Sequence, residues 1–195
     1  DKSFGYVLLT WFIMGFANLW TLPLRVDYIT APEWGIEGSA IFVAMIITVI
    51  PETLRMLLIP YWASLFDRMN FVVLRMILNL FFGLGVLLFF VTSNPWVIGL
   101  GAALIGAAFA GGSIAWNLWV TKYAPPGKTG AYMSVHVSLT GIRGTIGPIL
   151  GYWTVNQIGA QNIGILSCAM MFFATLMLIP EIKHGRNMLL KGKSL

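Results

Sequence analysis

Phe71–Val91 reads FVVLRMILNLFFGLGVLLFFV, and this run of residues decides the fold class. The run is long enough to cross a bilayer, because a membrane-spanning helix needs about 20 mostly apolar residues. Backbone polar groups inside lipid must form their hydrogen bonds within the segment itself, so a single run of this kind is helical. The stretch therefore predicts a transmembrane α-helix.

Five other stretches have the same character, and short links containing Pro, Gly and polar residues separate them. The sequence has no series of short alternating segments of the kind that forms a membrane β-barrel. We therefore expect an all-α membrane protein, a single bundle of six transmembrane helices over residues 1–195. The expected spans are Phe4–Tyr28, Ser39–Leu65, Phe71–Val91, Pro95–Tyr123, Gly130–Asn156 and Asn162–Glu181.

The composition excludes several classes of protein. Of the 195 residues, 58% are hydrophobic and only 10% are charged, whereas a soluble domain carries about 25% charged residues. A water-soluble chain of this length could not bury so much apolar surface in one core. The sequence has no Walker A motif, no paired CxxC and no H-E-x-x-H, so we expect no cofactor, no metal and no nucleic acid.

The positive charges predict the orientation in the membrane. If the N-terminus is cytoplasmic, the opposite side holds at most Arg25 among the basic residues of the links and ends. Cytoplasmic loops of membrane proteins are enriched in Lys and Arg, so both termini are expected in the cytoplasm, at the plasma (inner) membrane, with 183–195 as a basic tail. The residues expected on the cytoplasmic side are Lys2, Arg68, Arg75, Lys122, Lys128, Lys183, Arg186, Lys191 and Lys193.

Polar side chains at helical spacing distinguish four spans from the other two. The third and sixth expected spans have no charge within their apolar stretch, so we expect them to face lipid, while the other four line a polar path. This three-plus-three order indicates two three-helix repeats, residues 3–91 and 95–182. The polar faces are Asn18, Thr21 and Arg25; Thr48, Glu52 and Arg55; Ser113, Asn117 and Thr121; and His136, Thr140 and Arg143.

Two motifs carry a resemblance to a known family. The link Ala63–Asn70 resembles the G-x-L-x-D-R-x-G-R loop of the major facilitator superfamily, with Asp67 and Arg68 matching and both glycines replaced. Gly147–Gly151 resembles the G-P-x-x-G pattern of the fifth and eleventh helices of that family. The degenerate loop is similar to the copy in the C-terminal half, helices seven to twelve. The chain does not begin with Met, and we expect that it starts inside a longer protein that also supplies the N-terminal six-helix half.

The resemblance implies a secondary active transporter, not an enzyme, that moves a small polar solute by alternating access with proton or sodium coupling. The planar guanidinium of Arg143 suits a carboxylate or phosphate. It therefore favours an anionic solute, although sugars, peptides and drugs stay open as substrates. Arg143 could instead cap carbonyl groups or meet an acid in the other half. The candidate cavity residues are Arg143, Asn117, Asn18, His136 and Thr140.

Two other pairs of charges have candidate roles. Glu52 and Arg55 lie one helical turn apart. Glu52 could be a coupling carboxylate whose protonation Arg55 governs, or the two could form an internal ion pair. The resemblance implies that Asp67 and Arg68 form a conformational latch. His136 could relay protons near neutral pH or be a buried, hydrogen-bonded side chain.

Two other functions are possible for a six-span chain. Gly111, Gly112 and Ser113 resemble part of the rhomboid protease motif G-x-S-G, but Ile114 replaces the last glycine and no histidine lies in the sixth span. Without a general base, a serine is not activated as a nucleophile. The other alternative is a membrane scaffold or channel with no partner half, for which the sequence has no filter motif.

Overall fold

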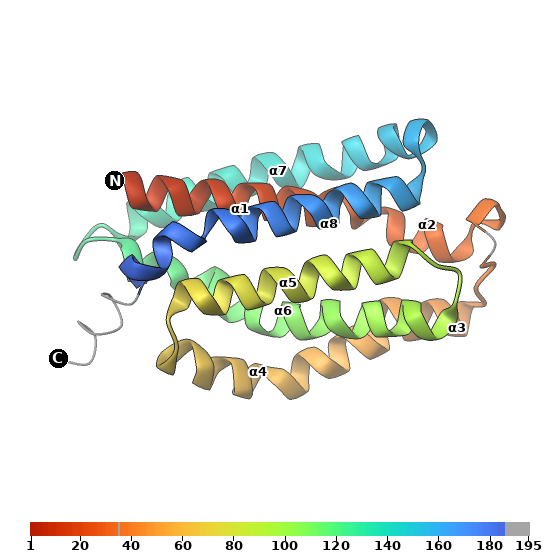
Figure 1. The fold of residues 1–195 in the computed structure, drawn as a ribbon, viewed down its shortest axis with the longest axis horizontal. Coiled ribbons are helices and arrows are strands. Elements are labelled where there is room, and N and C mark those ends of the chain that lie inside the picture. Colours follow the sequence, from red (N-terminus) through yellow and green to blue (C-terminus); the bar gives the residue numbers. More distant parts are fainter. Residues whose placement is uncertain (35, 186–195) are drawn as a thin grey trace.

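The computed structural model describes residues 1–34 and 36–185, except for the side chain of Asn117, and this part of the chain is a bundle of helices without strands (Figure 1). The all-α fold predicted from the sequence is therefore confirmed. The α-helices are α1 (Lys2–Thr21), α2 (Leu24–Thr30), α3 (Ala40–Ala44), α4 (Ile50–Arg68), α5 (Phe71–Phe90), α6 (Pro95–Tyr123), α7 (Thr129–Ile158) and α8 (Ala160–Met177). The short turns are 3₁₀ turns η1 (Pro32–Trp34) and η3 (Ile179–Glu181) and the π-helical turn η2 (Met45–Val49).

By length and composition, five helical segments could cross a membrane: Lys2–Thr30, Ala40–Arg68, Phe71–Phe90, Pro95–Trp116 and Ala160–Gly185. The remaining expected span, the fifth in chain order (Gly130–Asn156), corresponds to α7, which has 30 residues but is too polar to be among them. It nevertheless runs along α1. The rings of Phe4 and Tyr132 lie 4.5 Å apart near one end, and Trp20 Nε1 donates to Thr154 Oγ1 at 2.9 Å near the other. Crossing of the membrane by α7 stays a prediction.

Side chains in the links define where the helices begin. The Asn70 side chain accepts a hydrogen bond from the Val72 amide at 2.9 Å, and Asn94 accepts one from the Trp96 amide at 2.9 Å. Asparagine is a favoured N-cap because its oxygen satisfies an amide that the helix leaves unpaired. Between α7 and α8, Gly159 has φ +80°, a conformation that glycine adopts without steric cost.

Proline interrupts the first two spans. Pro23 lies between α1 and α2, and Pro51 is the second residue of α4, which follows the π-helical turn η2. Proline cannot donate a backbone hydrogen bond, and its ring clashes with the preceding turn, so the helix breaks or takes up an extra residue there. At Pro60, in the interior of α4, the helix continues although proline usually disturbs a helix.

The links gather at two ends of the bundle. Ser3 Oγ donates to Glu181 Oε2 at 2.6 Å, which places the start of the chain beside the end of α8. At the opposite end, the Tyr28 hydroxyl donates to the Thr92 carbonyl at 3.1 Å. The start of α1 and the end of α8 therefore share one end (Figure 1), as an even number of passes requires.

The pairing of helices is symmetric between the two halves of the sequence. The helix α4 packs on α6 as α7 packs on α1, and α5 packs on α6 as α8 packs on α1, while α5 and α8 pack on each other. Exchanging the first three long helices for the last three reproduces this pattern. The pairing supports the two repeats expected at 3–91 and 95–182, which remain a prediction.

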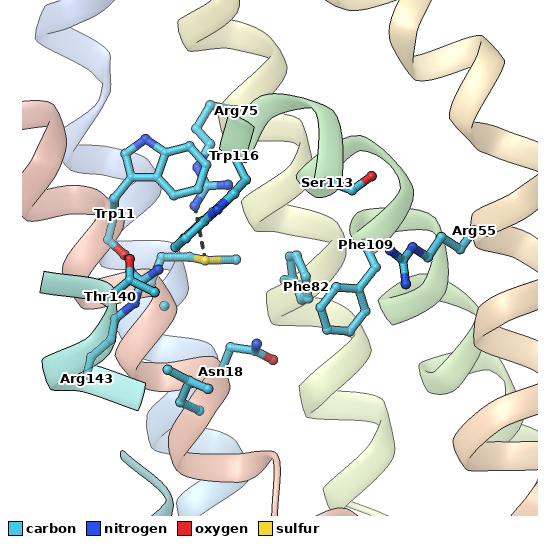
Figure 2. A pocket seen from close by; sticks show the side chains of 14 residues that line it. Trp11, Asn18, Arg55, Arg75, Phe82, Phe109, Ser113, Trp116, Thr140 and Arg143 are labelled. Carbon is cyan, nitrogen blue, oxygen red and sulfur yellow. Dashed lines mark hydrogen bonds between the residues drawn. The ribbon is translucent and has the colours of Figure 1, made fainter. Parts of the chain in front are cut away.

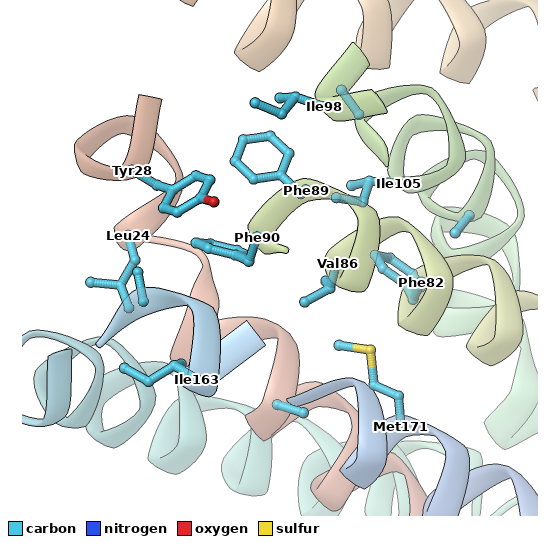
Figure 3. Packing of buried hydrophobic residues seen from close by; sticks show 14 of the residues in the cluster. Leu24, Tyr28, Phe82, Val86, Phe89, Phe90, Ile98, Ile105, Ile163 and Met171 are labelled. Carbon is cyan, nitrogen blue, oxygen red and sulfur yellow. The ribbon is translucent and has the colours of Figure 1, made fainter. Parts of the chain in front are cut away.

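Burial contradicts one expectation about α5. This helix lies between α6 and α8, and in its apolar segment 56% of residues are buried, against 11% for Ala40–Arg68. Its residues Phe82, Val86, Phe89 and Phe90 belong to a core cluster that Figure 3 shows beside Met171 of α8. Apolar residues suit a protein neighbour as well as lipid, so hydropathy could not separate the two. The third span is also not free of charge, because Arg75 is buried within it.

Candidate functional site

A cavity of about 370 Å³ lies between α1, α4, α5, α6 and α7 (Figure 2). Its size is within the range of about 300–1,000 Å³ that is usual for small-molecule sites. Among the described residues, none from α8 lines it. The third span contributes to the wall together with the four spans expected to line a polar path.

Arg143 of α7 enters the cavity wall with only 5% of its surface exposed. Its Nη1 donates to the Trp11 carbonyl, and its guanidinium carbon lies 5.0 Å from the centre of the Trp116 ring. A β-carbon at Gly15 would overlap the guanidinium. The missing side chain at Gly15 therefore makes room for Arg143 beside α1.

Arg75 of α5 is a second cation in the same wall. It is 2% exposed, and its guanidinium carbon lies 3.4 Å from the centre of the Trp11 ring. Its Nη2 donates to Met14 Sδ at 3.1 Å (dashed line in Figure 2), and a thioether is a weak acceptor. Arg75 was expected among the basic residues of the cytoplasmic side; its side chain turns into the bundle instead of standing in a link, and the side of the membrane on which it lies stays a prediction.

The two buried cations have no acidic partner in the described part of the chain. There, the one ion pair is Arg55 with Glu52, at 3.3 Å. Burying a charge without a partner is costly, since the interior solvates it poorly. An anion in the cavity would offset that cost for Arg75 and Arg143 together.

Asn18 and Thr140 also line the cavity. Asn18 Oδ1 accepts a hydrogen bond from Arg25 Nη2 at 2.7 Å, so Arg25 is turned into the bundle. Thr140 Oγ1 donates to the His136 carbonyl at 2.9 Å within α7. Asn117 lies on α6, and its side chain is outside the described residues.

His136 lies behind the cavity wall and does not line the cavity. It is 1% exposed, and its ring centre lies 4.3 Å from that of Trp116, 5.2 Å from Trp119 and 5.6 Å from Trp11. Within the described residues, its Nε2 has no hydrogen-bond partner. Its proton-relay role stays a prediction.

Glu52 and Arg55 form their ion pair at the edge of the cavity, on α4. The side chain of Arg55 is 41% exposed and that of Glu52 54%. Exposed pairs of this kind contribute about 0–1 kcal/mol to stability. Arg55 lines the main cavity, whereas Glu52 lines a smaller one of about 150 Å³ together with Arg25. The pair therefore lies between two cavities.

Asp67 and Arg68 are exposed at the end of α4, away from the cavity lining. In the described part of the chain, neither forms an ion pair. Their latch role stays a prediction.

Sequence reasoning missed the aromatic part of the wall, which consists of Trp11, Phe82, Phe109 and Trp116. A signal was present on α1, because Trp11 and Asn18 are seven residues apart and therefore share one helical face. An aromatic residue in a membrane helix usually packs against neighbouring helices or lipid, so Trp11 was not predicted to have a functional role.

A family model for the Major Facilitator Superfamily matches residues 3–193. No curated protein and no solved structure matched the chain. The family match covers almost the whole sequence and agrees with the helical bundle of membrane-length segments. The chain therefore belongs to the major facilitator superfamily, whose members are membrane transporters.

Proposed function

We propose that this chain is one six-helix half of a secondary active transporter, and that its central cavity binds a small anionic solute. One observation carries the proposal: Arg75 and Arg143 are both buried in the cavity wall, with no carboxylate paired to either among the described residues.

The chemistry of the two arginines favours an anion. A guanidinium is planar, remains charged and donates two parallel hydrogen bonds to a carboxylate or phosphate. Only one side-chain hydrogen bond is present from each of Arg75 and Arg143 in the described structure, so most of their donors remain for a solute. A neutral solute would leave both buried charges uncompensated.

Exposed apolar surface supports the presence of a second half. Met56 of α4 is 74% exposed and Ile149 of α7 is 63% exposed, and both helices also border the cavity. The N-terminal six-helix half of the same protein would cover such faces and close the cavity, while lipid covers the remainder. Rocking of the two halves would then open the site to each side in turn.

The charged pairs on α4 would support the transport cycle. Glu52 is paired at 3.3 Å with Arg55, which lines the main cavity. We assign this carboxylate to proton or sodium coupling. Asp67 and Arg68 would latch the two halves in one state at the cytoplasmic end.

The test is uptake by the full-length protein in proteoliposomes, with labelled organic anions, sugars and peptides, each with and without a proton or sodium gradient. We expect gradient-stimulated uptake of an anion. Arg143→Gln should lower its initial rate at least tenfold, and Arg143→Lys should restore part of it, because the charge remains and the planar fork is lost.

The matched control is Lys122→Gln, which removes one positive charge from an exposed position near the end of α6, outside the cavity lining. It should transport as the wild type does. Uptake restricted to neutral solutes, at a rate that Arg143→Gln leaves unchanged, would contradict the anion site.

A further inference from the structure

Four aromatic rings form the inner wall of the cavity. The ring centres of Phe82 and Phe109 lie 4.9 Å apart at 83°, and those of Trp11 and Trp116 lie 5.7 Å apart at 74°. These are edge-to-face pairs, which hold their rings in fixed orientations. In Figure 2 Phe82 and Phe109 lie between Arg143 and Arg55, with Trp11 and Trp116 above Arg143 and the phenylalanines, so apolar surface occupies the centre of the site.

Two buried cationic groups, Arg75 and Arg143, are at one end of this aromatic surface, whereas Arg55 at the other end is half exposed and paired with Glu52 at 3.3 Å. Arg75 lies against Trp11, and Arg143 lies near Trp116 and the backbone of Trp11. Arg143 Nε is buried and has no hydrogen-bond partner among the described residues. A ligand here meets donors for a carboxylate at one end and ring faces beyond them.

The wall offers few acceptors for a polyhydroxylated solute. Arginine and the Trp indole are donors only. Among the described lining residues, the side-chain oxygens are those of Asn18, Thr140 and Ser113. Asn18 Oδ1 already accepts from Arg25 at 2.7 Å, while the two hydroxyls donate to carbonyls of their own helices, and a hydroxyl that donates can still accept through its oxygen. A sugar has more hydroxyl donors than these few oxygens can accept, and burying the surplus without partners is unfavourable, whereas an aromatic ring presents no such groups.

We propose that the cavity selects an aryl carboxylate, a monoanion whose carboxylate lies between Arg75 and Arg143 and whose planar ring packs on Phe82, Phe109 and Trp116. This substrate class rests on the transport function proposed above and narrows it. The cavity of about 370 Å³ limits the ligand to a small molecule of this kind.

Binding to the purified full-length protein, measured by isothermal titration calorimetry, tests the class with four probes. They are benzoate, benzamide with the ring and no charge, cyclohexanecarboxylate with the charge and a non-aromatic ring, and acetate with the charge alone. We expect benzoate to bind at least tenfold more tightly than benzamide or acetate, a difference of about 1.4 kcal/mol. Cyclohexanecarboxylate should lie between benzoate and acetate.

A pair of variants isolates the contribution of the ring. Phe109→Leu removes an aromatic face from the wall and should weaken benzoate about fivefold while leaving acetate unchanged. Phe81→Leu is the control, because Phe81 is half-buried on α5 and packs on Trp62, 6.0 Å between ring centres, outside the cavity lining. It should leave the benzoate affinity unchanged.

Three results would overturn the aryl carboxylate class: acetate binding as tightly as benzoate, benzamide binding as tightly as benzoate, or no binding of benzoate. The proteoliposome uptake experiment distinguishes a failure of the aryl carboxylate class from a failure of the proposed transport function. Arg143-dependent uptake of a non-aromatic anion would reject the aryl class and retain the anion transporter. Uptake that Arg143→Gln leaves unchanged for every anion would reject both.

Discussion

At the scale of single residues, Gly15 positions the charge of Arg143 through the side chain that it lacks. An added β-carbon would overlap the far end of the Arg143 side chain, which can move, so we expect Gly15→Ala to displace the guanidinium without unfolding α1. Uptake of the transported anion should fall at least tenfold. The initial rate in proteoliposomes and the melting temperature are the two measurements.

The control for this substitution lies on the same helix. Gly5 has no neighbouring atom within 4 Å of an added β-carbon, so Gly5→Ala changes helix propensity by about 1 kcal/mol and displaces nothing. It should transport at the wild-type rate. If Gly15→Ala also transports at that rate, the guanidinium does not need its present position.

Individual cavity residues were predictable where polarity marks a membrane helix. Asn18, Thr140 and Arg143 were candidates because polar groups inside lipid are costly, and the structure places all three at the cavity. Arg75 was not predictable in this way. An arginine near the end of a span usually extends its side chain to the interface, so its sequence position indicated a cytoplasmic charge.

At the scale of helices, close packing of α5 on α6 depends on Gly85 and Gly101. A β-carbon at Gly101 would lie 2.8 Å from the Gly85 carbonyl oxygen and 2.9 Å from the Phe89 amide nitrogen. Backbone atoms cannot withdraw as a side-chain end can, so Gly101→Ala should separate the helices at a cost of about 1–3 kcal/mol. We expect the melting temperature of the detergent-solubilised full-length protein to fall by at least ~3 °C.

The same helix supplies a matched control. A β-carbon at Gly99 would meet the Ile46 side chain at 3.7 Å, an ordinary van der Waals contact. Gly99→Ala should therefore keep or raise the melting temperature. Equal melting temperatures for Gly99→Ala and Gly101→Ala would mean that the α5–α6 approach tolerates a methyl group.

The extent of most helices could be predicted from the sequence, because Pro, Gly and Asn mark their ends. The expected span Pro95–Tyr123 is the helix α6 itself, and Gly130–Asn156 differs from α7 by one residue at the start and two at the end. Interruptions were harder. Proline predicts a disturbance, but whether it gives a π-helical turn, as before Pro51, or an unbroken helix, as at Pro60, depends on the neighbouring helices.

At the scale of the whole molecule, the partners of each helix were the least predictable feature. Hydropathy separates apolar from polar surface but treats lipid and a neighbouring helix alike. It therefore placed α5 in lipid, although α5 packs between α6 and α8. The α7 helix shows the opposite effect, because polar residues along it, among them the exposed Ser134, Ser138 and Thr145, lower its hydropathy below that of the other membrane-length helices.

The two ends of the bundle give a direct test of its orientation. Lys122 is exposed near the end of α6, where Trp119 stacks on Phe4 at the start of α1, and Glu33 is exposed in η1, beside Tyr28 at the other end of the bundle. With a cysteine-free full-length background, we expect a membrane-impermeant maleimide added to intact cells to label Glu33→Cys and not Lys122→Cys. Permeabilisation should expose both. Labelling of both in intact cells would contradict a bundle that spans the membrane, and labelling of Lys122→Cys alone would place the basic links outside the cytoplasm, against the charge asymmetry.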